Sequence, residues 1–195
     1  MLRTESSRTS ACPPSAGSPS GESLPAGPQA AEPSGDAFRR FMGRWPTGVG
    51  VIGMLDGGNE CGMTANSLVS LSLSPLLVAV SVRLSSRAAS LLLPSSGFAV
   101  SILAQGQEQL ASWFARRERA DHGDGEFSNI SHGYAPRSGR PYLYDTVGFL
   151  DCVVEAQLTA GDHAVVIGRV EYLRALSDRP PLVFYRGGWS GVADA

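Results

Sequence analysis

The chain has 195 residues and a formal net charge of −2 at pH 7. A charge this close to zero gives no electrostatic reason to expect a nucleic acid or an anionic membrane as a partner. Every basic residue is an arginine, which excludes a Schiff-base lysine and the lysine of a Walker-type phosphate loop. Because no apolar run approaches the ~20 residues that span a bilayer, no membrane span is expected.

The composition changes at about residue 35. Residues 1–35 are rich in Ser, Pro, Gly and Ala and carry few large apolar side chains. Such a segment cannot bury enough apolar surface to offset the entropy lost on ordering, so we expect a disordered tail. No continuous apolar stretch follows its basic residues, which argues against a secretory signal. Residues 36–195 are enough for one compact domain with its own core.

The three cysteines, Cys12, Cys61 and Cys152, show no CxxC or other metal-ligand spacing. Cys152 falls on the apolar side of a strand pattern. We interpret the cysteines as free thiols rather than as disulfide partners or nucleophiles. Free thiols are the default in a reducing compartment, so the expected location is the cytoplasm.

The first predicted element of the domain is a short helix with Asp36 as its N-cap. Pro46 ends this helix, whose apolar stripe consists of Phe38, Phe41, Met42 and Trp45. A strand is predicted over residues 48–55, followed by Asp56-Gly57-Gly58, a strong hairpin-turn sequence. The return strand carries a polar run and leads into residues 76–82. This last stretch is almost entirely apolar and should be covered on both faces.

Helix and strand signals alternate in the middle of the chain. Residues 86–93 predict a short helix ended by Pro94, and residues 97–103 predict a strand. Residues 107–117 predict a second helix, with one apolar face made by Leu110, Trp113 and Phe114. The next stretch, 120–142, is loop-like. More than twenty residues is long for a connection without structure, which favours a functional lid or a dimer-contact loop.

Strands dominate the last third of the chain. In the first, polar Asp151, Glu155 and Gln157 alternate with the apolar residues Leu150, Cys152, Val154, Ala156 and Leu158. A second strand is predicted from His163 to about Leu173, after a tight Gly161-Asp162 turn, and residues 182–185 form the last strand. Many short strands with few helices indicate a mainly β fold, a closed antiparallel barrel with peripheral helices.

The run from Gly62 to Pro75 is unusual because small polar residues interleave with apolar ones, as GMTANSLVSLSLSP. Hydroxyls and a side-chain amide along a β edge offer a flat polar ligand many hydrogen bonds without fixed charge. This chemistry suits the polar rim of a flavin better than a metal, a nucleophilic attack or a nucleic acid. From composition alone, an ordinary edge strand with a polar face is the alternative.

Four motifs occur in a fixed order: Pro46-Thr47-Gly48, the run Thr64–Ser74, Ser81-Val82-Arg83-Leu84-Ser85-Ser86-Arg87, and Gly161-Asp162-His163 with Val166–Val170. In this order the chain resembles the flavin reductase family, specifically the small reductase components of two-component flavin monooxygenases. The resemblance covers residues 38–189. Any one motif alone would be weak, and four at comparable spacing make the match specific.

The resemblance implies a homodimer with the FMN-binding split β-barrel fold. It also implies that NADH or NADPH reduces FMN or FAD, and that the reduced flavin passes to a separate monooxygenase. Two alternatives stay open. One is a flavin-binding or carrier protein of the same barrel that does not turn over nicotinamide. The other is a related split-barrel enzyme that uses a bound flavin on an organic substrate.

The resemblance also assigns cofactor-binding residues. Thr47 and Gly48 would lie beside the flavin, and His163 near the point where the nicotinamide enters. Phe127 and Trp189 would be aromatic neighbours of the flavin. The isoalloxazine rim would be contacted by the polar run, here Thr64, Ala65, Asn66, Ser67, Leu68 and Ser70. The ribityl chain and phosphate would be reached by Ser81, Val82, Ser85, Ser86 and Arg87.

The expected chemistry needs no catalytic side chain, because hydride passes directly from nicotinamide C4 to flavin N5. Backbone N–H groups of residues 65–67 are candidates to face the N1–C2=O edge, where negative charge develops. The planar fork of Arg87 suits a phosphate, although Ser85 or Ser86 could simply cap a helix. His163 could equally be a structural residue at a strand end. No metal site is expected from Asp121, His122 and Asp124, which lack matched partners.

Overall fold

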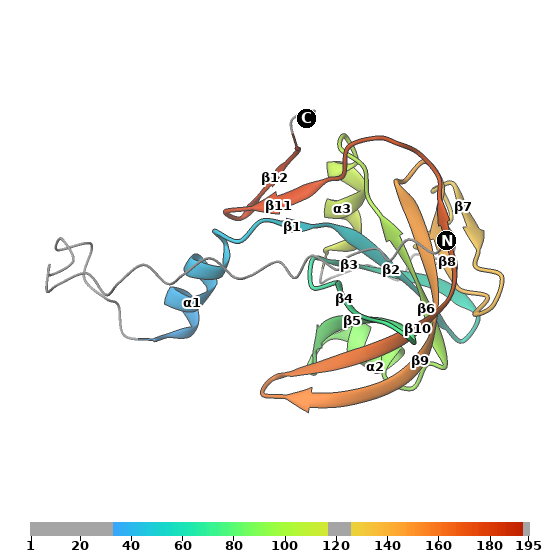
Figure 1. Ribbon diagram of the computed structural model, residues 1–195, viewed down its shortest axis with the longest axis horizontal. Helices are drawn as coiled ribbons and strands as arrows, with labels where there is room; N and C mark the ends of the chain where they lie inside the picture. The colour runs from blue at the N-terminus through green and yellow to red at the C-terminus, as the bar shows by residue number, and fades with distance from the viewer. Residues whose placement is uncertain (1–32, 117–125, 193–195) are drawn as a thin grey trace, which may run out of the picture.

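The computed structural model describes residues 33–116 and 126–192 of the chain. Within these ranges seven strands form one antiparallel sheet in the order β3-β2-β6-β9-β10-β5-β4. The sheet curls into a split barrel (Figure 1), which confirms the predicted fold class. Its strands are β2 (Gly50–Asp56), β3 (Asn59–Ala65), β4 (Val69–Leu73), β5 (Leu76–Arg83), β6 (Gly97–Ile102), β9 (Gly148–Ala160) and β10 (His163–Ala175).

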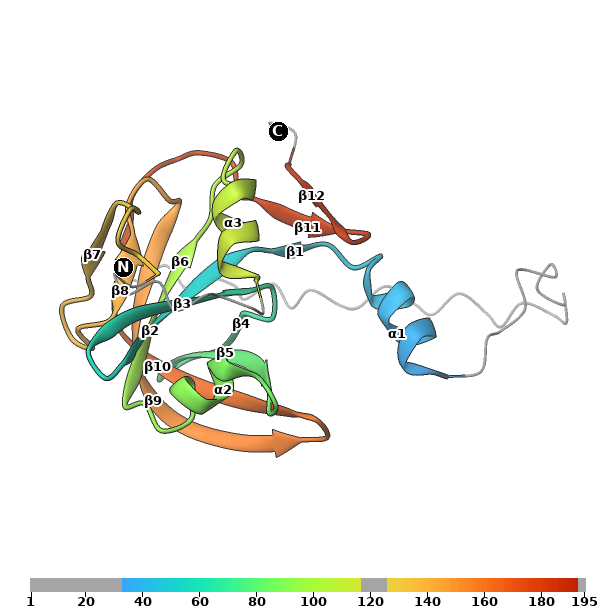
Figure 2. The same cartoon turned by 180° about the vertical axis from the view of Figure 1, so that it is seen from behind.

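Two small sheets and three helices complete the described part of the chain. One sheet has the order β1-β11-β12, and the other pairs β7 with β8. Figures 1 and 2 show α2 and α3 on opposite sides of the β2–β3 hairpin and α1 projecting away from the barrel. The strands are β1 (Thr47–Gly48), β7 (His132–Tyr134), β8 (Pro141–Leu143), β11 (Val183–Tyr185) and β12 (Gly188–Ser190). The helices are α1 (Gly35–Met42), α2 (Arg87–Leu92) and α3 (Glu108–Phe114).

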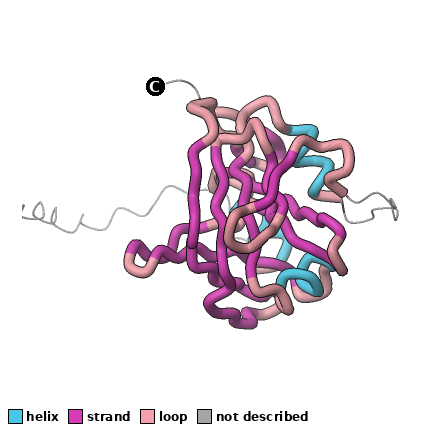
Figure 3. The backbone as a smooth tube through the Cα atoms, turned by 90° about the vertical axis from the view of Figure 1, so that its right-hand side faces the viewer, coloured by secondary structure: helices cyan, strands magenta, loops and turns pink. Residues whose placement is uncertain are grey.

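Strand alternation divides the core between the two faces of the sheet, which is the dominant element of the backbone trace (Figure 3). Ile52 and its neighbour Val51 are both buried but point to opposite faces of β2. Ile52 belongs to the cluster inside the barrel, which α2 closes with Leu92. Val51 belongs to the cluster under α3, which is anchored by Phe114. The barrel is therefore packed on both sides of β2 and β3.

The β2–β3 hairpin confirms the predicted turn. Asp56 pairs with Asn59, and the two residues between them, Gly57 and Gly58, have φ values of +58° and +100°. Glycine accepts this left-handed backbone at no steric cost. The same register sets Gly50 opposite Ala65. The chain therefore enters β2 at the end of the barrel where β3 leaves it.

The first helix differs from the prediction at both ends. Its N-cap is Ser34, whose hydroxyl accepts a hydrogen bond from the amide of Ala37 at 3.2 Å, whereas Asp36 lies inside the first turn. The helix ends at Met42, before Pro46. By contrast, α2 is capped by Ser86, one of the two serines named as candidate caps. Of the predicted tail, residues 1–32 lie outside the described residues.

The stretch predicted as a loop, 120–142, contains a β-hairpin in its described part, formed by β7 and β8. Its turn is closed by the amide of Ala135 bonding to the carbonyl of Arg140 at 2.8 Å, with Gly139 at a φ of +68°. Abundant Gly, Pro and Ser masked two strands of only three residues each. Residues 120–125, including Asp121, His122 and Asp124, lie outside the described residues.

Two further predictions were wrong in the last third of the chain. Asp151 was expected on the polar side of β9, yet it is fully buried. Its carboxylate accepts hydrogen bonds from the amides of Arg137 at 2.6 Å and Ser138 at 3.1 Å, which replace water. The predicted last strand is followed by β12, because Arg186 and Gly187 both take positive φ values and turn the chain back.

Candidate functional site

The polar run after β3 is tied to β5 by one side chain. The hydroxyl of Ser67 donates to the carbonyl of Ser81 and accepts from the amide of Ser81, both at 3.0 Å. Asn66, immediately before it, is exposed. The structure therefore brings two segments of the predicted site side by side: the polar run around Ser67 and the segment that begins at Ser81. Asn66 faces solvent.

Thr64 has a structural partner of its own. Its hydroxyl donates to the carbonyl of Ala111 in α3 at 2.7 Å, so it anchors β3 to that helix. Ala65 is buried, Leu68 is half-buried, and Ser70 is exposed on the edge strand β4. The hydroxyls of Thr64 and Ser67 thus anchor the polar run to its neighbours. Asn66 and Ser70 are exposed and remain available to a ligand.

Thr47 carries the one unsatisfied polar atom of the region. Its hydroxyl oxygen is the only buried side-chain nitrogen or oxygen without a hydrogen-bond partner in the part of the chain that the structure describes. Buried polar groups are almost always paired, so an orphan needs an explanation. Gly48 follows it and is exposed. An unpaired hydroxyl at the entrance to β2 fits a ligand that supplies the missing partner.

His163 lies at the start of β10, beside the Ser81 segment. The register sets His163 opposite Arg83 and Ala164 opposite the buried Val82. The Nδ1 atom of His163 lies 2.7 Å from a carboxylate oxygen of Asp162. Arg83 contacts the other oxygen of that carboxylate at 3.5 Å. The hydrogen bond to His163 lowers the pKa of Asp162, and its attraction to Arg83 acts in the same direction.

The cluster of Ser85, Ser86 and Arg87 has a clear structural role. Ser85 is exposed. The hydroxyl of Ser86 accepts from the amide of Ala89 at 3.2 Å and donates to the carbonyl of Arg83 at 2.7 Å, so it caps α2. Its predicted contact with a flavin would have to come in addition to these bonds.

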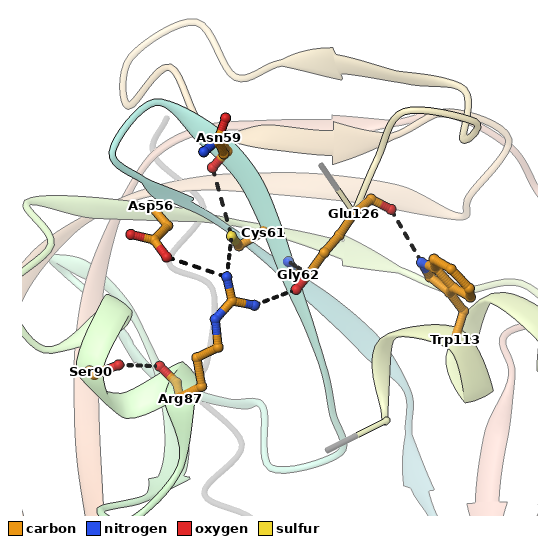
Figure 4. Close-up of polar contacts among 8 residues, drawn as sticks. All are labelled: Asp56, Asn59, Cys61, Gly62, Arg87, Ser90, Trp113 and Glu126. Carbon is orange, nitrogen blue, oxygen red and sulfur yellow. Dashed lines mark hydrogen bonds and ion pairs between the residues drawn. The ribbon is translucent and has the colours of Figure 1, made fainter. Parts of the chain in front are cut away.

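The guanidinium of Arg87 contacts three side chains (Figure 4). It donates to Glu126 at 2.6 Å, to Asp56 at 3.3 Å and to the sulfur of Cys61 at 3.4 Å. Burial alone would lower the pKa of Arg87, but the hydrogen bond to Glu126 raises it above its ordinary value. Sequence analysis missed Glu126 because nothing near it in the chain indicates a partner 39 residues away.

The two predicted aromatic neighbours occupy different environments. Phe127 is fully buried, with its ring centroid 4.9 Å from that of Phe114, so in this structure it is a core residue. Its place near the flavin stays a prediction. Trp189 is half-buried on β12, donates from Nε1 to the hydroxyl of Ser112 at 3.3 Å and packs against Phe184. Phe184 pairs with Thr47 in the same sheet.

The described cysteines are unsuited to nucleophilic chemistry. Cys61 and Cys152 are buried free thiols. Burial raises the pKa of Cys61, and it raises the pKa of Cys152 to about 12. Both therefore stay protonated at neutral pH. Within the described residues no group of His, Cys, Asp and Glu could hold a metal ion, and no helix is long and apolar enough to cross a membrane.

The curled seven-stranded sheet defines a split-barrel protein. The chain belongs to the flavin reductase family, since residues 42–193 match the model of the flavin reductase like domain. It is 37% identical over 164 residues to the NADH-dependent FMN reductase AsuE2 of Streptomyces nodosus subsp. asukaensis, covering 84% of this chain and 88% of that one. The flavin-dependent monooxygenase reductase subunit HsaB of Rhodococcus jostii is 33% identical, covering 80% of this chain and 76% of that one.

Solved structures agree with this membership. The NADH:FAD oxidoreductase SgcE6 of Streptomyces globisporus superposes with a TM-score of 0.79 at 31% identity, covering 86% of this chain and 99% of that one. The same protein in complex with NAD and FAD fragments superposes with a TM-score of 0.77 at 32% identity, covering 85% of this chain and 98% of that one. The family resemblance found in the sequence is thereby confirmed.

Proposed function

We propose that the chain is an NADH-dependent flavin reductase that reduces FMN or FAD and supplies the reduced flavin to a partner monooxygenase. One observation carries the proposal. Four segments far apart in sequence converge at one end of the barrel: Thr47–Gly48, Ala65–Ser67, Ser81–Val82 and His163–Ala164. The buried, unpaired hydroxyl of Thr47 belongs to this end. The names of the relatives AsuE2, SgcE6 and HsaB support the nicotinamide, the flavin and the partner, respectively.

The residues present fit a flavin by their chemistry. When bound, a flavin would supply the hydride acceptor, so no acid or base would be required of the protein. The hydroxyl of Ser67 fixes this segment to Ser81, and we assign the backbone amides of residues 65–67 to the polar edge of the ring. Thr47 supplies a hydrogen-bonding hydroxyl. His163, held by Asp162 and 37% exposed, remains accessible to a nicotinamide.

The test is oxidation of NADH or NADPH by the purified chain in the presence of FMN or FAD, followed as loss of nicotinamide absorbance. A carrier protein of the same barrel would bind flavin without oxidising nicotinamide. NADH should react faster than NADPH. Failure of all four pairings would refute the reductase assignment and leave the carrier alternative.

We also infer that the chain forms a homodimer. Every residue of α1, which the structure describes in full, is at least partly exposed, and the side chains of Phe38, Phe41 and Trp45 are 66–69% exposed. Leu73 on the edge strand β4 is 84% exposed. Apolar surface of this kind is typical of an interaction face. The described free thiols, Cys61 and Cys152, support the cytoplasmic location expected from the sequence.

Light scattering on the eluted protein tests the dimer. Phe41→Ser with Trp45→Ser should shift the mass toward the monomer, whereas Arg140→Met, distant from α1, should leave it unchanged. A monomeric wild-type chain at micromolar concentration would contradict the inference.

A further inference from the structure

Arg87 joins three separate parts of the chain (Figure 4). It is the first residue of α2 and directly follows the cap Ser86. Its guanidinium bonds to Glu126, to Asp56 at the tip of the β2–β3 hairpin, and to Cys61 on β3. One side chain therefore ties the start of α2 to both strands of the β2–β3 hairpin near its turn, and to the chain at residue 126.

Glu126 is fixed along the edge of β3 by side chain and backbone together. The Glu126 side chain is only 10% exposed. One carboxylate oxygen bonds to Arg87, and the other accepts from the amide of Gly62 at 2.7 Å. Its backbone amide donates to the carbonyl of Glu60 at 3.3 Å. Because β3 is an edge strand of the large sheet, Glu126 bonds to backbone groups on the outer side of that strand.

Among the residues that the structure describes, the charges in contact with Arg87 argue against an anion site. Asp56 and Glu126 together carry a formal charge of −2 against the +1 of Arg87. A flavin phosphate, with roughly −1.5 to −2 charges, would meet these carboxylates on approaching the guanidinium.

We propose that Arg87 is a positioning residue that, with Glu126, clamps the start of α2 to β3, and that it does not bind the flavin phosphate. Gly62, which Glu126 holds, lies two residues before Thr64. Ser86, which Arg87 follows, ends the segment that begins at Ser81. The contact between Arg87 and Glu126 thus fixes the distance between the polar run, residues 62–75, and the segment 81–86. The Ser67–Ser81 bonds join the same two segments at another point. The inference rests on the proposed flavin site.

Dissociation constants for FMN and for riboflavin, which lacks the phosphate, test the clamp. Arg87→Met removes the charge at similar length, and Glu126→Gln keeps the shape. Each variant should raise the dissociation constants for FMN and riboflavin by the same factor, about tenfold, as expected for the loss of one charge-assisted hydrogen bond. The double variant should be no weaker than the worse single variant, because the two residues act as one unit.

Arg140→Met is the matched control. Arg140 also joins two segments through its guanidinium, with bonds to the carbonyl of Gly97 at 3.2 Å and the hydroxyl of Ser95 at 3.1 Å. Gly97 starts β6, which places these bonds at the opposite end of that strand from Ile102, the partner of Gly50. This variant should leave both dissociation constants unchanged.

Three results would overturn the clamp. Arg87→Met could weaken FMN at least tenfold more than riboflavin, Glu126→Gln could tighten FMN alone, or neither variant could change either constant. Because partial unfolding would also raise both constants by one factor, the folded fraction of each variant is measured by urea unfolding and the constants are corrected for it. Failure of the wild-type chain to bind either flavin would instead refute the proposed function, and the role of the clamp with it.

Discussion

The hydroxyl of Ser67 takes the place of a strand partner for Ser81. It bonds to both the amide and the carbonyl of that residue at 3.0 Å. The pairing of β4 with β5 ends at Val69 and Ala79, so Ser81 lies beyond the last paired residue on that side. One side chain thereby continues the sheet edge and holds the polar run against it.

Ser67→Ala should therefore destabilise the fold as well as the site. The change leaves the amide and carbonyl of Ser81 without this partner, and the free energy of unfolding should fall by about 1–3 kcal/mol. Urea unfolding measures the loss. The exposed Ser128→Ala is the control and should stay within about 0.5 kcal/mol of wild type. A change in Ser67→Ala no larger than in the control would show that the bridge contributes nothing.

His163→Ala should raise the KM for NADH with little change in flavin affinity, because the ring lies at the proposed nicotinamide entrance. Asp162→Asn should produce a smaller change in the same direction, since Asp162 orients the ring through a 2.7 Å contact. Steady-state kinetics at saturating flavin measure both. Unchanged kinetics in both variants would identify His163 as a structural residue at a strand end.

Stability should decline at alkaline pH in part because of Cys152. Burial raises the pKa of this thiol to about 12, so the folded state keeps a proton that the unfolded state releases near its ordinary pKa. The contribution is complete below the ordinary pKa and is lost as the pH rises toward 12. Over this window the free energy of unfolding should fall by about 1.4 kcal/mol per pH unit from this group.

Urea unfolding between pH 8 and pH 10.5 checks the alkaline prediction. Cys152→Ala should be less stable throughout, because it leaves a cavity, but its stability should depend less steeply on pH. Parallel curves for wild type and variant would contradict the assignment of the slope to Cys152.

The elements that could be predicted from the sequence have local causes. Gly57 and Gly58 supply the positive φ values of the hairpin turn, and Ser86 supplies the cap of α2. The polar run and the Gly161-Asp162-His163 turn were predicted to contribute to one site. The register of β10 with β5, together with the Ser67–Ser81 bonds, sets them in adjoining positions.

The elements that could not be predicted depend on partners distant in sequence. Alternation shows that Asp151 faces away from Cys152 but not that the amides of Arg137 and Ser138 cover it. The guanidinium of Arg87 is chemically suited to bind a phosphate. Only the folded chain shows that it bonds to Glu126 and Asp56 instead. Charge partners at such separations leave no periodic signal.

Anaerobic mixing of the flavin-loaded chain with NADH tests the central claim most directly. The oxidised flavin band and the nicotinamide band are recorded together in a stopped-flow instrument. A reductase should bleach the flavin in step with the loss of NADH, one molecule for one, and air should then restore the flavin band. Flavin that stays oxidised in the presence of excess NADH would contradict the account.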